Sequence, residues 1–261
     1  MTAAGLLLTG TLLVGWFMAL VFGIALRLRN FSIVDIAWSA NFTPLALLYA
    51  GLGTGDLARR TLLAAMVTLW SLRLAWHLLM RIASHHPQED GRYLQLRQAW
   101  ADGLKRRFFF FFQFQAALNV VLSVPFVLAC VDKRRGLGPF EWAGMALFLV
   151  ALVGEAMADA QLRAFKAKPA HRGKTCQAGL WRYSRHPNYF FEWLIWCSYF
   201  VFVLPSPWGW ITLYCPLLML WFLFRVTGIP MAEAQALRSR GDEYREYQRT
   251  TSSFVPWFPR H

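Results

Sequence analysis

Long apolar stretches alternate with shorter polar segments along this chain of 261 residues. Several apolar stretches run for about 18 to 24 residues with almost no charge, the length that a helix needs to cross about 30 Å of hydrocarbon. The pattern predicts an all-α integral membrane protein with seven transmembrane helices. The predicted spans are residues 4–26, 34–52, 61–82, 108–130, 140–163, 189–204 and 207–225.

No internal repeat or low-complexity linker separates these spans. Pro205, Ser206 and Pro207 predict a tight turn that joins the last two spans into a helical hairpin. The first span is too long for a removable signal peptide and lacks a small-residue cleavage site, so we expect it to be the first helix of the mature protein. We therefore expect residues 1–261 to form one seven-helix membrane domain.

The composition supports this prediction, because 57% of the residues are hydrophobic and 16% are charged. The net charge is nevertheless +13. When alternate connections are placed on opposite sides of the membrane, 21 of the 27 Lys and Arg residues lie on one side and five on the other, with Arg73 inside a span. This asymmetry predicts an N-terminus outside and a C-terminus in the cytoplasm. Anionic lipid headgroups account for the basic charge, and we expect no nucleic-acid partner.

Motifs for metal or for common nucleotide folds are absent from the sequence. The four cysteines stand far apart, with no Cys-x-x-Cys pair and no His spacing that would close a metal site, so we interpret them as packing residues. Neither a G-x-G-x-x-G fingerprint nor a phosphate-binding G-x-x-x-x-G-K-[ST] loop occurs. Membrane helices and their loops would have to hold any nucleotide.

Polar residues gather at the predicted cytoplasmic ends of the last three spans. On the fifth span four of them are spaced by four, four and three residues, so they share one helical face. An internal ladder of ion pairs would explain that face alone, but polar residues continue on the next two helices and predict a shared cavity that opens to the cytosol, formed mainly by 155–261. These residues are Glu155, Asp159, Arg163 and Lys166, then Asn188 and Glu192, and finally Arg225 and Glu233.

A basic loop between the fifth and sixth spans points to an anionic ligand. Its cations, together with a helix N-terminus near Tyr189, form a site suited to phosphate oxygens. Nearby aromatic rings would sandwich a nucleobase, although an interfacial aromatic belt fits them equally well. The cations and the histidine of this loop are Lys168, Arg172, Lys174, Arg182, Arg185 and His186. The aromatic residues are Trp181, Tyr183, Tyr189, Tyr244 and Tyr247.

The same region resembles the C-terminal signature of steroid 5α-reductases. In that family an Asp-x3-Arg helix precedes a Gly-Gly-Leu-Phe-x-Tyr loop and an Asn-x3-Glu helix. The matching segments here are Asp159 to Arg163, residues 178–183, which read Ala-Gly-Leu-Trp-Arg-Tyr, and residues 188–193, which read Asn-Tyr-Phe-Phe-Glu-Trp. The similarity continues to the tail, where Tyr247 stands nine residues before Pro256, and covers about 100 of the 261 residues.

A second resemblance involves residues 185–189, Arg-His-Pro-Asn-Tyr. This segment is similar to the corresponding loop of intramembrane sterol reductases of the C14/C24 type, and a close variant occurs in isoprenylcysteine carboxyl methyltransferases. These families resemble one superfamily whose cavity holds either NADPH or S-adenosylmethionine. The number of cations favours NADPH, which carries a diphosphate and a 2′-phosphate. Residues 32–38 and 89–93 resemble a bacterial branch of the reductases, which implies a multi-pass protein of the bacterial inner (cytoplasmic) membrane.

The resemblance implies NADPH-dependent reduction of the Δ4 double bond of a 3-oxo-Δ4-steroid or a similar lipid enone. A hydride would pass to the β-carbon, and the resulting enolate would be protonated. The alternative is methyl transfer from S-adenosylmethionine, and a non-catalytic lipid-binding or transport protein is a third hypothesis. The implied cofactor-binding residues are Asp159, Arg163, Lys166, Lys174, Trp181, Tyr183, Arg185, His186, Asn188, Tyr189, Glu192, Arg225, Glu233, Tyr244 and Tyr247.

The chain departs from the animal reductases on the substrate side, because neither their Gln-Glu pair on the second helix nor their tyrosine on the third is evident. We therefore name Asp35, Tyr93 and Glu192 as candidate catalytic residues, with Asp35 as a protonated donor if its pocket is apolar. Trp38 and Gln115 are candidate substrate contacts. The alternatives are a helix-dipole role for Asp35, surface packing of Tyr93 and a helix-to-helix hydrogen bond from Gln115.

Overall fold

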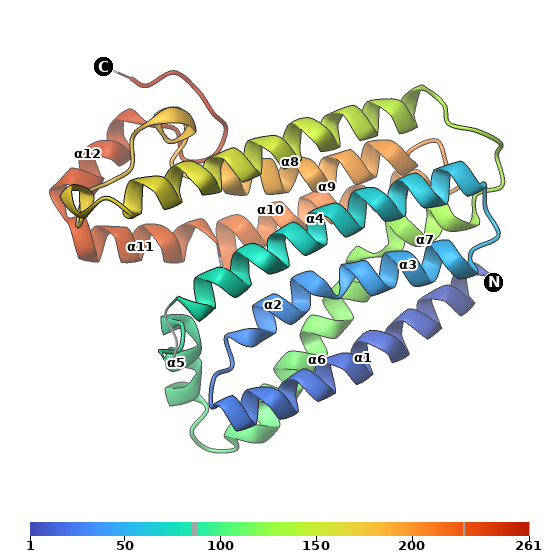
Figure 1. Ribbon diagram of the computed structural model, residues 1–261, viewed down its shortest axis with the longest axis horizontal. Helices are drawn as coiled ribbons and strands as arrows, with labels where there is room; N and C mark the ends of the chain where they lie inside the picture. Colours follow the sequence, from blue (N-terminus) through green and yellow to red (C-terminus); the bar gives the residue numbers. More distant parts are fainter. Residues whose placement is uncertain (85–87, 227, 261) are drawn as a thin grey trace. The chain divides into compact units, whose positions relative to one another are not determined.

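The computed structural model describes residues 1–84, 88–226 and 228–260, and every regular element in these ranges is helical (Figure 1). The residues form two compact units, which are described separately. Unit 1 contains residues 1–138 and 206–209, and unit 2 contains residues 139–205 and 210–261. The division does not test the prediction of a single membrane domain, which stays a prediction.

Six helical stretches within the described residues are long and apolar enough to cross a membrane. They bear large side chains that face outward, such as Leu12 and Trp16, each 65% exposed, as expected of surfaces that lie against lipid. The chain is therefore an all-helical, multi-pass membrane protein. The six stretches are Ala3–Leu28, Ile33–Leu52, Leu57–Ala83, Leu104–Val131, Pro139–Lys166 and Gly209–Arg240.

The predicted sixth span corresponds to a shorter helix, α9, of 17 residues (Pro187–Val203). It is not among the six stretches, so the count of seven spans and their orientation stay predictions. A turn follows α9 at Pro205 and Ser206, where the sequence predicted one. Beyond the turn, the last long stretch is a succession of helical segments, including a π-helical turn at Phe222–Val226.

Unit 1 contains the first seven helices, and two of its predicted spans are broken. The second span bends at Asn41 and the fourth at Ser123. Asn119 Nδ2 donates to the Trp38 carbonyl at 3.0 Å, and Asn41 Nδ2 donates to Asn119 Oδ1 at 2.9 Å. These side chains replace backbone hydrogen bonds that lipid cannot supply. The helices are α1 (Ala3–Leu28), α2 (Ile33–Ala40), α3 (Phe42–Leu52), α4 (Leu57–Ala83), α5 (Gly91–Ala99), α6 (Leu104–Leu122) and α7 (Val124–Val131).

Hydrogen bonds join the connections of unit 1 in alternate pairs. Asp90 N donates to Ser32 Oγ at 3.0 Å, which links the first connection to the third. Asp56 N donates to the Asp132 carbonyl at 2.8 Å, which links the second to the fourth. Alternate connections therefore lie on the same side of unit 1, as a chain that crosses a membrane repeatedly requires.

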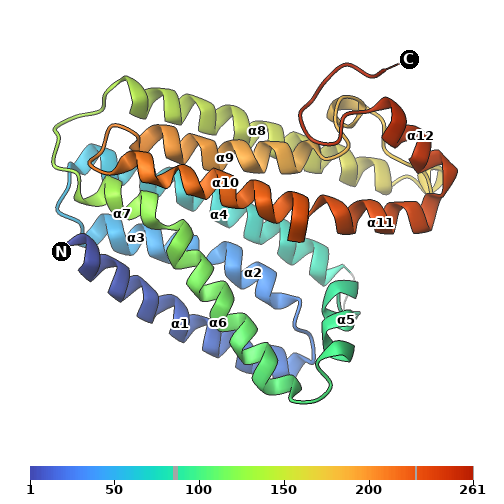
Figure 2. The same ribbon diagram turned by 180° about the vertical axis from the view of Figure 1, so that it is seen from behind.

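Unit 2 is built on α8 (Pro139–Lys166), which packs along α9 (Figure 2). Two glycines of α8 allow this close approach: a Cβ on Gly144 would lie 2.8 Å from the backbone N of Phe202, and one on Gly154 would lie 2.4 Å from the Phe191 ring. The remaining helices of the unit, which lie beyond α9, are α10 (Tyr214–Trp221), α11 (Ile229–Arg240) and α12 (Asp242–Thr250).

We expect Gly144→Leu to destabilise unit 2 by about 1–3 kcal/mol, because backbone atoms of α9 occupy the space that the new side chain needs. Thermal unfolding in detergent would measure the loss. Gly23→Leu on α1 is the matched control, since nothing lies within 4 Å of a Cβ there. Equal unfolding temperatures for the two variants would contradict the close packing.

Candidate functional site

The helix pair α8 and α9 brings together the two polar motifs of the sequence. Asp159 lies on α8, is 5% exposed, and accepts a hydrogen bond from Asn188 Nδ2 at 3.2 Å. Asn188 follows Pro187, the first residue of α9. Proline is favoured at this position because a backbone N–H there would have no partner within the helix. The sequence predicted that these residues face one cavity, and the structure places them in direct contact.

Glu192 lies one turn further along α9 than Asn188. Its carboxyl is buried and accepts a hydrogen bond from Trp196 Nε1 at 3.2 Å. Glu155 of α8 is also buried, and the carboxyls of Glu155 and Glu192 both act electrostatically on the Tyr199 hydroxyl. A buried cluster of acids and aromatic side chains therefore lies between the two helices, beyond the Asp159 contact.

The connection from α8 to α9 is fixed by hydrogen bonds to α8. Gly179 has a φ of +60°, which suits glycine, and a Cβ there would lie 2.5 Å from the Gln161 side chain. Gln161 Oε1 accepts from Leu180 N, and Trp181 Nε1 donates to the Ala158 carbonyl, both at 2.9 Å. Trp181 is buried, so it supports the loop and is not exposed to sandwich a nucleobase.

Arg185 forms the centre of a second cluster in unit 2. Its Nε donates to Glu233 Oε1 at 2.7 Å, and its Nη1 donates to the carbonyls of Gln248 at 2.9 Å and Thr251 at 2.6 Å. The sequence predicted that Arg185 would contact phosphate. Its Nε and Nη1 instead contact residues of the C-terminal tail and anchor that tail. His186 Nε2 lies 3.2 Å from the same Glu233 oxygen.

Aromatic residues of the predicted cofactor region mostly pack within the protein. The imidazole of His186 stacks on Tyr189 with ring centroids 5.4 Å apart, and Tyr183 meets Phe258 edge to face. Tyr247 is buried, and its hydroxyl donates to the carbonyls of Trp181 and Ser184.

Tyr244 and Tyr247 both lie on α12 and stay neutral at physiological pH. Burial, followed by the negative charge of Glu233, raises the pKa of Tyr244 to about 12. Burial also raises the pKa of Tyr247 well above its usual range. Tyr247 donates the hydrogen bonds that fix α12 in place, and Tyr244 packs against its ring edge to face.

The cations that remain accessible in this region lie at the end of α8, in the following loop and near the π-helical turn. They point away from the buried clusters and are the groups that an anionic ligand would meet. The exposed members are Arg163, Lys166, Lys168, Arg172, Lys174, Arg182 and Arg225.

Unit 1 brings together Asp35 and Tyr93, which are far apart in the sequence. The Tyr93 hydroxyl donates to Asp35 Oδ1 at 2.6 Å, and Arg92 Nη2 donates to Asp35 Oδ2 at 2.8 Å. Arg81 Nη2 lies 3.8 Å from the same oxygen, and Asp90 binds Arg92 from the other side. Asp35 therefore lies in an ion-pair cluster and not in the apolar pocket that the expected role as a protonated donor required.

The proton of this cluster is held by Tyr93. Burial first, and then the negative charge of Asp35, raise the pKa of Tyr93 well above its usual range, although Arg92 acts in the opposite sense. The ring lies 6.3 Å from that of Phe111 on α6 and does not lie at an open surface. The one proton of this phenol is donated to Asp35, so Tyr93 would have to release Asp35 before it donates to another oxygen.

The two candidate substrate contacts are also in unit 1. Trp38 is half-buried at the end of α2, with its ring 5.2 Å from that of Phe42. Its indole Nε1 is enclosed and has no hydrogen-bond partner within the described part of the chain. Gln115 is half-buried on α6. Among the described residues, no three His, Cys, Asp or Glu side chains gather as a metal site would need.

Several contacts of these clusters were not predicted from the sequence. Gln161 and Gln248 carry no motif, and their roles depend on partners 19 and 15 residues away. Arg92 lies in the segment 89–93, to which the resemblance pointed. Its position shortly after Glu89 and Asp90 was the only local signal of an ion-pair cluster.

The comparisons with known proteins identify a family but no activity. A family model described as a protein of unknown function, DUF1295, matches residues 21–251. The chain belongs to the DUF1295 family. An uncharacterised protein of Schizosaccharomyces pombe is 30% identical over 206 residues, which cover 70% of this chain and 60% of that protein. This chain thus spans about 60% of the length of the relative. No solved structure matches this chain.

We expect Tyr93→Phe to lower stability by about 1–3 kcal/mol near neutral pH, because the hydrogen bond to the Asp35 carboxylate is lost. The raised pKa predicts the sign of the pH dependence. An unfolded phenol ionises near pH 10, so the wild type should lose this advantage as the pH rises above about 10. Thermal unfolding of the wild type and the variant between about pH 8 and about pH 11 would measure the difference in their stability. A difference that does not change with pH would contradict a buried, neutral phenol.

We expect Glu233→Gln to loosen the C-terminal tail, because Arg185 loses its charged partner at a site where the Arg185 and Glu233 side chains are only 10% and 16% exposed. The expected cost is about 1–3 kcal/mol, measured by thermal unfolding, with faster proteolysis beyond α11. Glu246→Gln is the control, since its pair with Arg249 is exposed and should change stability by less than about 0.5 kcal/mol. Equal effects of the two substitutions would show that Glu233 does not anchor the tail.

Proposed function

We propose that the protein is an NADPH-dependent reductase that acts on the conjugated double bond of a lipid-soluble enone, as the resemblance to steroid 5α-reductases implies. The observation that supports it most directly is the contact between Asp159 and Asn188, because the two helices of the signature join at these residues. The proposal includes seven spans, a cytoplasmic C-terminus and a bacterial inner membrane. A 3-oxo-Δ4-steroid is the substrate class that the resemblance favours.

Unit 2 has a donor set that fits an anionic dinucleotide. Exposed cations follow the Asp159 contact at the end of α8 and in the loop, and Arg163 and Lys174 are examples. Bound NADPH would supply a hydride. The diphosphate and the 2′-phosphate would meet these exposed cations, while Asn188 and Glu192 provide polar groups deeper between the helices.

Unit 1 has the groups that the protonation half of the reaction needs. Tyr93 holds a proton at its hydroxyl, Asp35 orients that hydroxyl, and Arg92 places a positive charge beside it. As the substrate carbonyl gains negative charge, the Tyr93 hydroxyl would turn its one proton from Asp35 to that oxygen, and the enolate would then take a proton at the α-carbon. We assign the donor role to Tyr93 and the positioning role to Asp35.

The alternative function is methyl transfer from S-adenosylmethionine, of the isoprenylcysteine carboxyl type. One observation favours it: Arg185 is engaged by Glu233 and by backbone carbonyls, which removes a cation from the predicted phosphate site. S-adenosylmethionine carries one carboxylate and a positive sulfonium, so it needs fewer cations. The two functions are separable because they consume different cofactors.

The direct test is NADPH oxidation by the purified protein with a panel of 3-oxo-Δ4-steroids and other lipid enones. We expect oxidation only when an enone is present, with the reduced lipid as product. Transfer of labelled methyl from S-adenosylmethionine to a prenylated carboxylate, without NADPH oxidation, would replace the proposal by its alternative. No turnover in either assay would support a lipid-binding protein.

Variants separate the two halves of the reaction. Tyr93→Phe should lower kcat by about a hundredfold with little change in the KM for NADPH, because it removes a proton donor. The Arg163→Gln, Lys174→Gln double variant should raise the KM for NADPH by about tenfold and leave kcat nearly unchanged, because these cations only bind. The Lys133→Gln, Arg135→Gln double variant, which removes two exposed cations of unit 1, is the control for general charge effects.

A further inference from the structure

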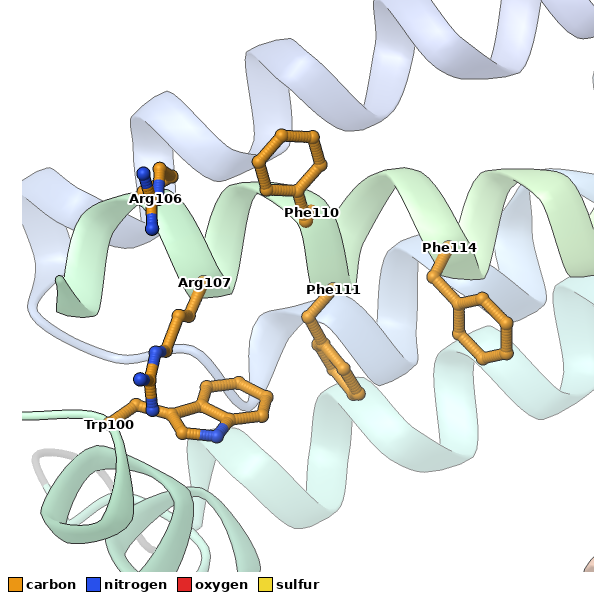
Figure 3. A pocket seen from close by; sticks show the side chains of 6 residues that line it. All are labelled: Trp100, Arg106, Arg107, Phe110, Phe111 and Phe114. Carbon is orange, nitrogen blue, oxygen red and sulfur yellow. The ribbon is translucent and has the colours of Figure 1, made fainter.

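A pocket of about 650 Å³ lies in unit 1 at the beginning of α6, apart from the contacts that support the proposed reaction (Figure 3). Its wall is almost entirely aromatic, with two arginines at one end. It is an open recess on the side of the helix. The lining residues are Trp100, Arg106, Arg107, Phe110, Phe111 and Phe114.

The helical repeat explains how charge and aromatic rings share this wall. Arg107, Phe111 and Phe114 are separated by four and three residues, so they project from one face of α6. Figure 3 shows these three side chains directed to the side of the helix on which Trp100 lies. Arg106 and Phe110, four residues apart, form the adjacent row. The pocket therefore has a cationic end and an apolar end along the same helix.

The cationic end lacks internal partners of opposite charge. Both arginines are exposed, and in the parts of unit 1 that the structure describes neither guanidinium is ion-paired. Arg107 makes one long contact, from Nη1 to the Ala99 carbonyl at 3.5 Å. Lys105 adds a third positive charge, and Asp102 is the acid nearest in sequence. An anion is thus the complementary ligand.

The position of the pocket along the membrane span suits an amphiphile. The apolar stretch that contains α6 begins at Leu104, so Arg106 and Arg107 lie in its first turn. Phe114 is seven residues beyond Arg107, which corresponds to about 10 Å along the helix. This is the spacing over which a lipid changes from its charged headgroup to its acyl chains. A free anion would use only the arginine end and would leave the aromatic wall uncovered.

We propose that this pocket is a binding site for one anionic phospholipid of the surrounding bilayer. Its phosphate lies against Arg107, whose guanidinium forms charge-assisted hydrogen bonds to phosphate oxygens, and Arg106 adds positive charge from the adjacent row. An acyl chain lies along Phe111 and Phe114, which project to the same side of the helix as Arg107. An aromatic belt would also place such residues at the interface, but a belt needs neither a recess nor paired arginines.

The site also touches the ion-pair cluster of unit 1 through one side chain. Phe111 lines the pocket, and its ring lies 6.3 Å from that of Tyr93. A bound lipid would therefore cover the aromatic wall that supports the Tyr93 phenol. The binding proposal does not depend on the reaction that the protein catalyses.

Native mass spectrometry of the full-length protein tests the proposal. The protein in detergent would receive equal amounts of phosphatidylglycerol and phosphatidylcholine with identical acyl chains. We expect one phosphatidylglycerol to be retained in preference to phosphatidylcholine by about tenfold, as two cations near an anionic headgroup predict. Equal retention of the two lipids would overturn the proposal.

Three variants localise the effect. Arg106→Gln with Arg107→Gln should remove the tenfold preference, whereas Lys133→Gln with Arg135→Gln should keep it, although both variants remove two exposed charges. Phe114→Ser should weaken retention of both lipids, because it shortens the apolar wall. All these side chains are exposed, and unchanged unfolding temperatures would show that the variants fold. Equal losses in the two double variants would indicate unspecific attraction and overturn the site.

Inorganic phosphate distinguishes a lipid site from a simple anion site. If the acyl chain contributes, millimolar phosphate should leave the retained phosphatidylglycerol unchanged. Displacement of the lipid by phosphate alone would show that the arginines bind any anion, and it would overturn the assignment to a phospholipid.

Discussion

Hydrocarbon offers no hydrogen bonds, and this constraint governs every polar group of the structure. A helix satisfies its own backbone, but each break in a helix exposes carbonyls that need another partner. In unit 1, Asn119 supplies it by donating to the Trp38 carbonyl and accepting from Asn41. The polar residues within the apolar stretches are therefore required for helices that bend, and they do not weaken the prediction of a membrane protein.

The same constraint decides how charges are arranged near the ends of the helices. Arg59 is only 1% exposed, and it donates to the carbonyls of Arg134 and Gly136, both at 2.7 Å. Asp132, 3.7 Å from Arg59, is also held by Arg134. Burial alone would raise the pKa of Asp132, but hydrogen bonds from Arg134 hold it below its usual range. A charge that leaves water is stable here only because several partners surround it.

Both clusters that bear on function follow this rule, and they use it differently. Around Glu233, two cationic or potentially cationic side chains and Gln248 satisfy the carboxylate, so the cluster fixes the tail. Around Asp35, the same kind of ion pairing includes a phenol whose proton is held beside a guanidinium. The second arrangement differs from the first because it holds a single phenol proton between a buried ring and a carboxylate, beside a guanidinium.

The sequence by itself determined the helical class, the approximate positions of the apolar stretches and the residues of interest, because hydrophobic length and helical spacing are local properties. Asp35 and Tyr93 were both named from the sequence, as were Asp159 and Asn188. Their pairing was decided by the tertiary structure, since the partners lie 58 and 29 residues apart. The surroundings of Asp35 were decided in the same way, because its ion-pair partner Arg92 comes from another helix. Arg185 likewise had a basic sequence context that indicated phosphate, whereas folding placed Glu233 and two tail carbonyls within its reach.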